Sequence, residues 1–275
     1  MERRFDASET IERQALEDLH AALPSPLAKA LGVRRVQVGG ALVSLSSIEP
    51  SILINRTIGL GVDRAPTPAE IATIHTAYAD AGVDEYFVHL TEGAGHPAVV
   101  AMLRAAGWVP DRGWMKFVRG NEPAPTPDSD LSVRAISGEH AADFARIVAH
   151  GFDLVQRTQD WLGCLVGRPN WHVYISFDGD RSVGTGALFV SNGIGYFDFG
   201  ATDPEFRGRG GQSALLAHRI GEARRLGCTT LVTATGEAVP GDPQHSYHNI
   251  MRAGFKETYL RRNWVLDRAE RCAAG

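Results

Sequence analysis

The chain has 275 residues, of which 44% are hydrophobic and 22% charged, and its formal net charge is −4. This composition is typical of a globular protein with one large or two moderate cores. The slight acidity argues against binding through overall charge to nucleic acid or to an acidic membrane, so we expect neither partner.

The N-terminal stretch is charged throughout and lacks the apolar core of a signal peptide, and no apolar run approaches the ~18 residues that span a bilayer. The three cysteines, Cys164, Cys228 and Cys272, lack the spacing of a metal site. Together these features predict a reduced, cytoplasmic protein without a structural metal.

The first clear boundary along the chain is a proline-rich segment, "GNEPAPTPDSD". Three prolines between small and acidic residues predict an extended linker. We therefore expect a first domain over residues 1–120, a linker over 121–130 and a second domain over 131–275. In the first domain, the stretch 55–61 ("NRTIGLG") favours a turn-rich strand end.

The second domain alternates strand and helix patterns. The order strand, two helices, three strands, helix, strand, helix, strand predicts an α/β fold with a mixed sheet, or α+β in some schemes. We expect strands over 131–136, 171–178, 181–190, 193–202, 228–235 and 258–267, and helices over 138–152, 158–168, 213–226 and 243–255.

The end of the first domain is similar to the end of the second. Residues 81–119 and 226–266 both run through a glycine, a strand, a glycine-rich loop, a helix and a strand with tryptophan. The triplet Ala106-Gly107-Trp108 aligns with Ala253-Gly254-Phe255. Such internal similarity favours a duplication, although strand–helix–strand patterns are common by chance.

The stretch "DPEFRGRGGQSALLAHRI" (203–220) combines glycines and arginines in front of an amphipathic helix. A helix start carries unsatisfied N–H groups and partial positive charge, which favour an anion. The glycines let the backbone approach a ligand closely, and Arg207 and Arg209 add charge suited to phosphate. Because the loop follows a buried strand, we expect a pyrophosphate at the carboxyl end of the sheet.

This stretch resembles the acyl-CoA signature of the GNAT superfamily of N-acetyltransferases. Arg207 and Gly210 match the arginine and first glycine of the signature, and Pro204 and Phe206 match the pair before them. Gln212 departs from the usual small residue, and Thr202 from the usual valine. The segment "SYHNIMRAGFKETYLRRNWV" is also similar to the later helix and strand of the family.

The resemblance implies two GNAT-like domains, each a mixed, mostly antiparallel sheet flanked by helices. The first domain lacks the arginine–glycine pattern, so the resemblance implies one active site, in the second domain. The implied reaction transfers an acetyl group from acetyl-CoA to a primary amine by direct attack. Residues implied to bind the co-substrate are Gly200, Ala201, Thr202, Arg207, Gly208, Arg209, Gly210, Gly211, Gln212, Ser213, Ser246 and Asn249.

The same resemblance implies catalytic residues. Asp198, an acid in an otherwise apolar strand, is the candidate general base. The position of the family's tyrosine acid holds Ile250, and Tyr247, one turn earlier, is the candidate substitute or a packing residue. Glu237 is a candidate for binding a cationic substrate. His245 and His248 lie three apart on a helix but lack further ligands, so we expect no metal.

Three alternatives stay open at this point. The chain is a non-catalytic CoA-binding sensor or scaffold if it has lost its acid, or an enzyme for longer acyl chains. The acceptor is a small molecule or a peptide amine, since a fold does not choose its substrate. The protein is a monomer or a homodimer.

Overall fold

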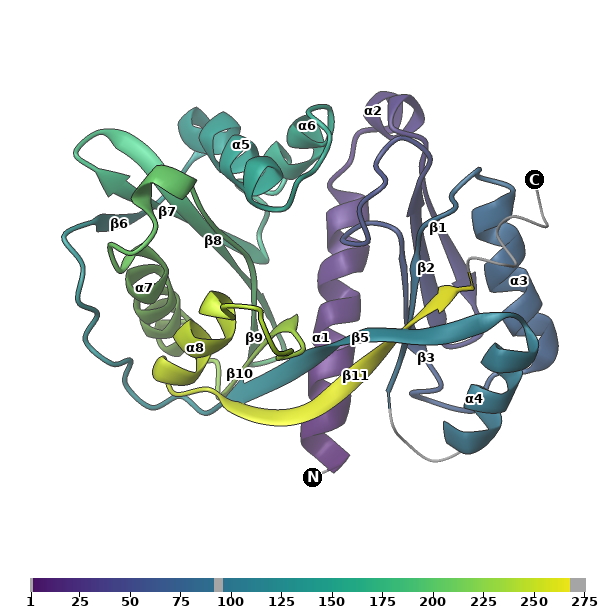
Figure 1. Cartoon of the computed structure of the whole chain (residues 1–275). Helices are drawn as coiled ribbons and strands as arrows, with labels where there is room; N and C mark the ends of the chain where they lie inside the picture. Colours follow the sequence, from purple (N-terminus) through teal and green to yellow (C-terminus); the bar gives the residue numbers. More distant parts are fainter. Residues whose placement is uncertain (1, 92–95, 268–275) are drawn as a thin grey trace. The chain divides into compact units, whose positions relative to one another are not determined.

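The computed structural model describes residues 2–91 and 96–267, which form two compact units (Figure 1). Unit 1 comprises Met1–Leu23 and Met115–Tyr259, and unit 2 comprises Pro24–Trp114 and Leu260–Gly275. These units do not follow the division at 120 and 131. The first helix and the last strand cross it, because each takes part in the packing or pairing of elements from the other half.

Unit 2 is a sheet with helices. Its strand order is β1-β2-β3-β4-β11-β5, where β11 and β5 contribute the parts that belong to this unit. A cluster of buried side chains, including Ile74, Tyr78, Leu103 and Trp108, lies in its core. Its elements are α2 (Ser25–Ala30), β1 (Val33–Val38), β2 (Ala41–Ser46), β3 (Arg56–Leu60), α3 (Pro68–Ala79), β4 (Phe87–Leu90), α4 (His96–Ala105), the first part of β5 (Trp108–Arg119) and the end of β11 (Lys256–Leu266).

Unit 1 has the strand order β5-β10-β9-β8-β7-β6, and helices cover both faces of this sheet (Figure 1). Helices α7 and α8 pack on Tyr174, Leu188 and Phe197, whereas α5 meets the opposite face through Phe144 and Phe199. Its elements, besides the shared strands, are α1 (Glu2–Ala21), β6 (Ser132–Ala135), η1 (Gly138–His140), α5 (Ala141–Gly151), α6 (Thr158–Gly163), β7 (Trp171–Asp178), β8 (Arg181–Ser191), β9 (Ile194–Thr202), η2 (Pro204–Phe206), α7 (Gly211–Arg225), β10 (Thr230–Gly236) and α8 (His245–Arg252).

The pairing pattern of the strands is the same in both units. In unit 2, β1–β2 and β2–β3 are antiparallel and β3–β4 is parallel. In unit 1, β7–β8 and β8–β9 are antiparallel and β9–β10 is parallel. A helix joins the parallel pair in each unit, α3 in one and α7 in the other. The repeated pattern supports the duplication that the sequence favours.

Helix α1 is tied to unit 1 by polar contacts. Arg168 Nε donates to Asp18 Oδ1 at 2.6 Å, and Trp161 Nε1 donates to the carbonyl of Leu19 at 2.8 Å. Glu12 and Lys116 form an ion pair in which both side chains are 1% exposed. The sequence pattern of residues 2–21 did not predict this helix, which only the structure reveals.

Most elements of unit 1 agree with the prediction within a few residues, and the linker over 121–130 has no helix or strand. Helix α6 is an exception, because it ends at Gly163 rather than at residue 168. Residues after it form tight turns, in which the N–H of Val166 bonds to Gly163 and that of Arg168 to Leu165. Gly167 adopts φ +88°, which a helix does not contain.

Candidate functional site

The pairing between strands β9 and β10 stops before either strand ends. Their parallel ladder pairs Ile194–Phe197 with residues 230–233 and stops there. Strand β9 continues to Thr202 and β10 to Gly236, so the carboxyl ends of both have backbone groups outside this ladder. The carboxyl edge of a sheet, at a point where neighbouring strands diverge, is where α/β proteins bind ligands.

A β-bulge lies at the same end of β9. Ala187 faces Asp198, but Thr185 faces Ala201, so β9 has one residue more than β8 over this stretch. Phe199 takes φ +50° there, and its N–H donates to Asp198 Oδ1 at 2.8 Å. Bulges of this kind redirect backbone and side chains next to functional sites. Gly200, the next residue, is exposed.

The loop from β9 to α7 has the geometry of an anion site. Gly210 precedes the helix with φ +73°, and a Cβ there would lie 2.0 Å from the carbonyl oxygen of Asp128, so only glycine fits. Helix α7 begins at Gly211, and within the described chain no side chain caps it. The first N–H groups of this helix are therefore available to a ligand.

The two arginines of the loop differ. Arg209 pairs with Asp178, at 2.8 Å between Nη1 and Oδ2, and with Asp130. These carboxylates raise the pKa of Arg209, and Arg209 lowers the pKa of both acids. Arg207 is exposed and makes no ion pair with the described residues. The geometry therefore favours Arg207 over Arg209 as a phosphate contact.

Gln212 ties the helix to the bulge. Its Nε2 donates to the carbonyl of Ala201 at 2.7 Å, to Thr202 Oγ1 at 3.0 Å and to the carbonyl of Thr185 at 3.2 Å. The departure from the family's small residue thus supplies a connection between α7 and the strand pair. Ser213 follows in the first turn and is half-buried.

The candidate residues on α8, and Glu237 after β10, have contacts or positions that do not by themselves indicate a catalytic or binding role. The aromatic ring of Tyr247 packs edge-on against Phe117, with 5.1 Å between ring centroids. Ser246 does not cap the helix, because Gln244 holds the cap position in a left-handed conformation. Asn249 Oδ1 accepts a hydrogen bond from Arg252 at 2.5 Å. Glu237 directly follows β10, at the carboxyl edge of the sheet.

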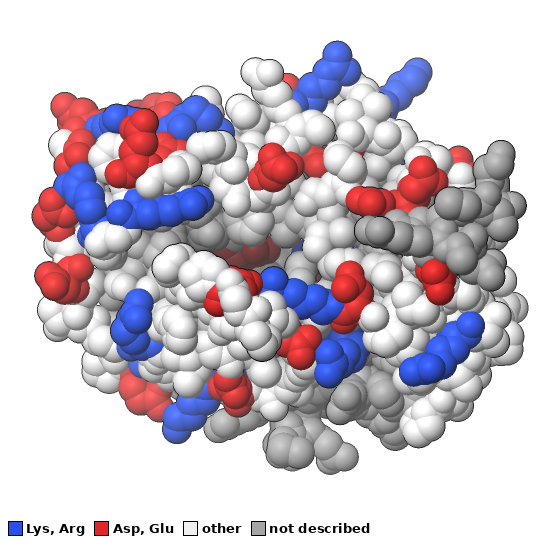
Figure 2. Space-filling view, viewed as in Figure 1, with Lys and Arg blue, Asp and Glu red and all other residues white. Residues whose placement is uncertain are grey.

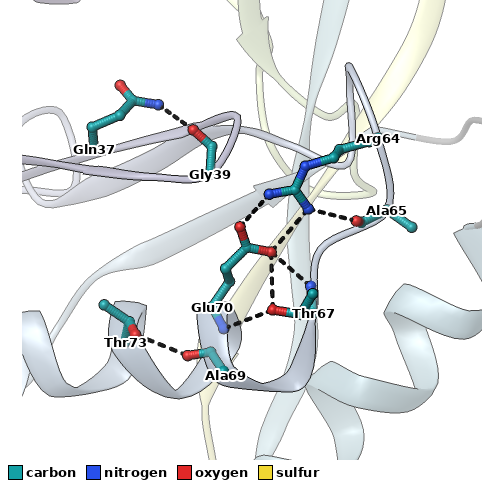
Figure 3. Close-up of polar contacts among 8 residues, drawn as sticks. All are labelled: Gln37, Gly39, Arg64, Ala65, Thr67, Ala69, Glu70 and Thr73. Carbon is teal, nitrogen blue, oxygen red and sulfur yellow. Dashed lines mark hydrogen bonds and ion pairs between the residues drawn. The ribbon is translucent and has the colours of Figure 1, made fainter.

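The corresponding helix of unit 2 is closed by its own side chains (Figure 3). Thr67 and Glu70 form a capping box, in which the Thr67 N–H donates to Glu70 Oε2 at 2.7 Å. Arg64 clamps the same carboxylate with both terminal nitrogens, and this pairing helps to hold the pKa of Glu70 at about 2. A carboxylate of the chain itself therefore occupies the helix start of α3.

The distribution of charged side chains on the visible face does not point to a particular ligand or partner. On the face that Figure 2 shows, described basic and acidic side chains are interspersed. Among the described residues, no three His, Cys, Asp or Glu side chains are grouped to hold a metal ion. The same residues include no helix that is long and apolar enough to cross a membrane.

Comparisons with known proteins support the family resemblance and the fold. Residues 130–255 match the model of the acetyltransferase (GNAT) family, and this segment of the chain is a GNAT domain. The sequence-based resemblance is thereby confirmed for that segment, which contains the bulge, the loop and both helices α7 and α8. No curated protein matches the chain.

Solved structures extend the likeness of fold to most of the chain. A GCN5-related N-acetyltransferase from Kribbella flavida has a TM-score of 0.59 at 14% identity, covering 90% of this chain and 94% of its own. A GCN5-related N-acetyltransferase from Sphaerobacter thermophilus has the same score and identity, covering 83% and 81%. A putative GNAT acetyltransferase from Novosphingobium aromaticivorans scores 0.53 at 13% identity, covering 87% and 92%. At these identities the likeness shows the fold, a mixed α/β fold of the GNAT type.

Sequence reasoning missed two features of this site. The bulge at Phe199 depends on register with β8, which no local pattern reveals. The second feature is Arg219, which lies on the buried side of α7, and the sequence pattern of this helix could have revealed it. It follows Leu215 by four residues and Leu216 by three, on the apolar face of the helix, where an arginine is unusual.

Proposed function

We propose that the chain is an acyl-CoA-dependent N-acyltransferase that transfers acetyl from acetyl-CoA to a primary amine in a ternary complex. The observation that carries the proposal is the uncapped start of α7, reached through Gly210, within a segment that matches the GNAT family. The N–H groups of residues 211–213 would hold the pyrophosphate, with Arg207 beside them. Further contacts are proposed at Gly208, Ser246 and Asn249.

Unit 2 is proposed to have no second co-substrate site. Its helix start is filled by Glu70, whose negative charge repels a phosphate at the place where α7 would attract one. One acyl-CoA site per chain follows from this difference between two otherwise equivalent helices.

In the proposed reaction, the amine lone pair attacks the thioester carbon and the C–S bond breaks. Asp198 is the proposed base, directly or through water, and takes the proton that the amine must lose. Backbone N–H groups at Gly200 to Thr202 would stabilise the oxyanion of the tetrahedral intermediate. Tyr247 or water would protonate the departing thiolate, and Glu237 is proposed to attract the cationic acceptor.

A second candidate function is a CoA-binding sensor without turnover. It is favoured by one observation, that Ile250 is buried in the core at the position of the family's tyrosine acid. In this case acetyl-CoA binds but no amine is acetylated.

The test combines binding with turnover. Calorimetric titration with acetyl-CoA comes first, followed by thiol release in the presence of a panel of amino acids, polyamines, amino sugars and peptides. Asp198→Asn should lower kcat most at neutral pH and below, whereas Asp180→Asn, in the exposed β7–β8 turn, should not. Binding without turnover on any amine would select the sensor, and absence of binding would contradict both.

A further inference from the structure

Arg219 is a buried cation directly beneath the bulge of β9. Its side chain is fully buried, and no carboxylate of the described residues lies within ion-pair distance of its guanidinium. Burial lowers its pKa to about 10, so it stays charged at neutral pH. The nearby charge of Asp198 raises the pKa of Arg219 and so offsets part of the effect of burial, although the two side chains form no ion pair. A charge that is buried without a direct ion pair is costly to a fold, which makes its retention informative.

The hydrogen bonds of Arg219 go to backbone carbonyls on both strands of the bulge. Nη1 donates to the carbonyl oxygen of Ala187 at 3.0 Å and to that of Asp198 at 3.2 Å. These two residues face each other in the ladder just before the extra residue of the bulge. Nε donates to Leu215 of its own helix at 3.1 Å, which fixes the direction of the side chain. The guanidinium thus joins α7 to the last regular pair of β8 and β9.

The surrounding residues leave space for this arrangement. A Cβ at Gly186 would lie 2.6 Å from Arg219 Cζ, so the side chain occupies volume that any other residue would fill. The ring of Phe197 lies 5.0 Å from Cζ, within the range of a cation–π contact. Nη2 lies 3.9 Å from the place of a Cβ at Gly200, the residue proposed to face the acyl group.

We propose that Arg219 is a positioning residue for acyl transfer. It fixes the bulge that presents the N–H groups of Gly200 and its neighbours, and its buried charge polarises the thioester carbonyl that these groups bind. A cation beneath the carbonyl becomes more stabilising as negative charge develops on the oxygen, and the burial of Arg219 limits its screening by water. This inference rests on the proposed function, since it assumes that acetyl-CoA binds over β9.

The test measures the thioester carbonyl of bound acetyl-CoA directly and needs no amine acceptor. Isotope-edited infrared spectroscopy measures the stretching frequency of the thioester carbonyl of acetyl-CoA bound to the full chain. In wild type we expect a lower frequency than in water. Arg219→Met should still bind acetyl-CoA through the loop, yet lose most of that shift. Arg225→Met, an exposed arginine of the same helix, should behave as wild type.

Three results would overturn the inference. One is a wild-type frequency equal to that in water, and another is a folded, binding Arg219→Met with the wild-type frequency. If that variant does not fold, Gly186→Ala replaces it, because the added methyl group displaces the guanidinium. The third result is a carbonyl frequency in Gly186→Ala that equals the wild-type frequency. A wild type that binds no acetyl-CoA would instead mark the failure of the proposed function, and the inference would fall with it.

Discussion

The two arginines of the loop differ in their contacts, although they lie two residues apart. Arg209 holds the loop to Asp178 at the end of β7 and to Asp130 at the end of the linker. The hydroxyl of Ser129 also donates to the carbonyl of Arg209, at 2.8 Å. Arg207 makes no such contact with the described residues, which supports its proposed role as a phosphate contact. The sequence predicted both as phosphate contacts, because residue type alone does not reveal which carboxylates the fold brings near.

The loop arginines should therefore respond differently to substitution. Arg207→Met should weaken acetyl-CoA binding about tenfold or more, the loss of one charge-assisted contact, with little change in melting temperature. Arg209→Met should lower the melting temperature of the ligand-free protein, because the loop loses its brace. Calorimetric titration and thermal unfolding separate the two effects. The same melting loss in both variants would contradict the distinction.

Glu70 gives unit 2 a pH dependence of its own. Arg64 and the Thr67 N–H lower its pKa from 4.5 to about 2 in the folded state. The carboxylate therefore stabilises the fold fully above pH ~4.5, the unfolded value, and this stabilisation is lost as the pH falls towards 2. The contribution is small because Arg64, the partner of Glu70, is exposed to solvent.

We expect Glu70→Gln to melt below wild type at neutral pH, with a difference that shrinks as the pH falls below 4.5. The exposed Glu139→Gln of unit 1 is the control and should show no such trend. Thermal melts followed by circular dichroism over this range make the comparison. A difference that is constant with pH would mean that the charge of Glu70 is unimportant.

At the scale of elements, local patterns predicted what local chemistry determines. Helix α7 and its glycine-rich start were predicted because the apolar spacing and the turn lie within twenty residues. The bulge in β9 and the hydrogen bonds of Arg219 to the carbonyls of Ala187 and Asp198 depend on contacts between residues distant in sequence, so they were not predicted. Helix α1 was not predicted for the same reason, because its partners Lys116 and Arg168 lie about a hundred residues or more away in the sequence.

The buried pair of Glu12 and Lys116 should be the strongest polar link of α1. Lys116→Met removes the cation that pairs with the buried carboxylate of Glu12, and breaking a buried pair costs about 3–5 kcal/mol in comparable cases. Adding Glu12→Leu should recover most of that loss, because an apolar pair of similar volume packs in its place. Urea denaturation of the single and double variants measures both values. A single variant as stable as wild type would show that the pair is not essential to the docking of α1.

At the scale of the whole molecule, the two halves of the sequence exchange elements. Strand β11 lies beside β4 in unit 2, with Trp264 opposite Val88, and β5 lies beside β10 in unit 1. The linker prediction located a real break in regular structure, yet the compact units cross it. Composition marks where a chain is extended, but not which strands it later pairs.

A fragment of residues 121–275 should therefore not fold alone, although it contains the whole segment that matches the GNAT family. It lacks α1 and β5, which cover and extend the sheet of unit 1. Co-expression with residues 1–120 should restore a folded protein that binds acetyl-CoA. Circular dichroism and gel filtration of the fragment decide, and a stable monomeric fragment with acetyl-CoA affinity would contradict the exchange.

The central claim is that one acyl-CoA site exists and that it lies at the start of α7. The most direct measurement is thermal unfolding with and without acetyl-CoA for wild type, Gly210→Ala and Gly61→Ala, each compared with its own ligand-free sample. Both glycines have positive φ, +73° and +75°, in equivalent loops, but only a Cβ at Gly210 would collide with backbone.

At a ligand concentration ~100 times its dissociation constant, binding should add about 2.7 kcal/mol, or several degrees at roughly 2–4 °C per kcal/mol. We predict this shift in wild type and in Gly61→Ala, and none in Gly210→Ala. A shift that persists in Gly210→Ala and vanishes in Gly61→Ala would place the site in unit 2, and no shift in wild type at millimolar acetyl-CoA would remove the site altogether.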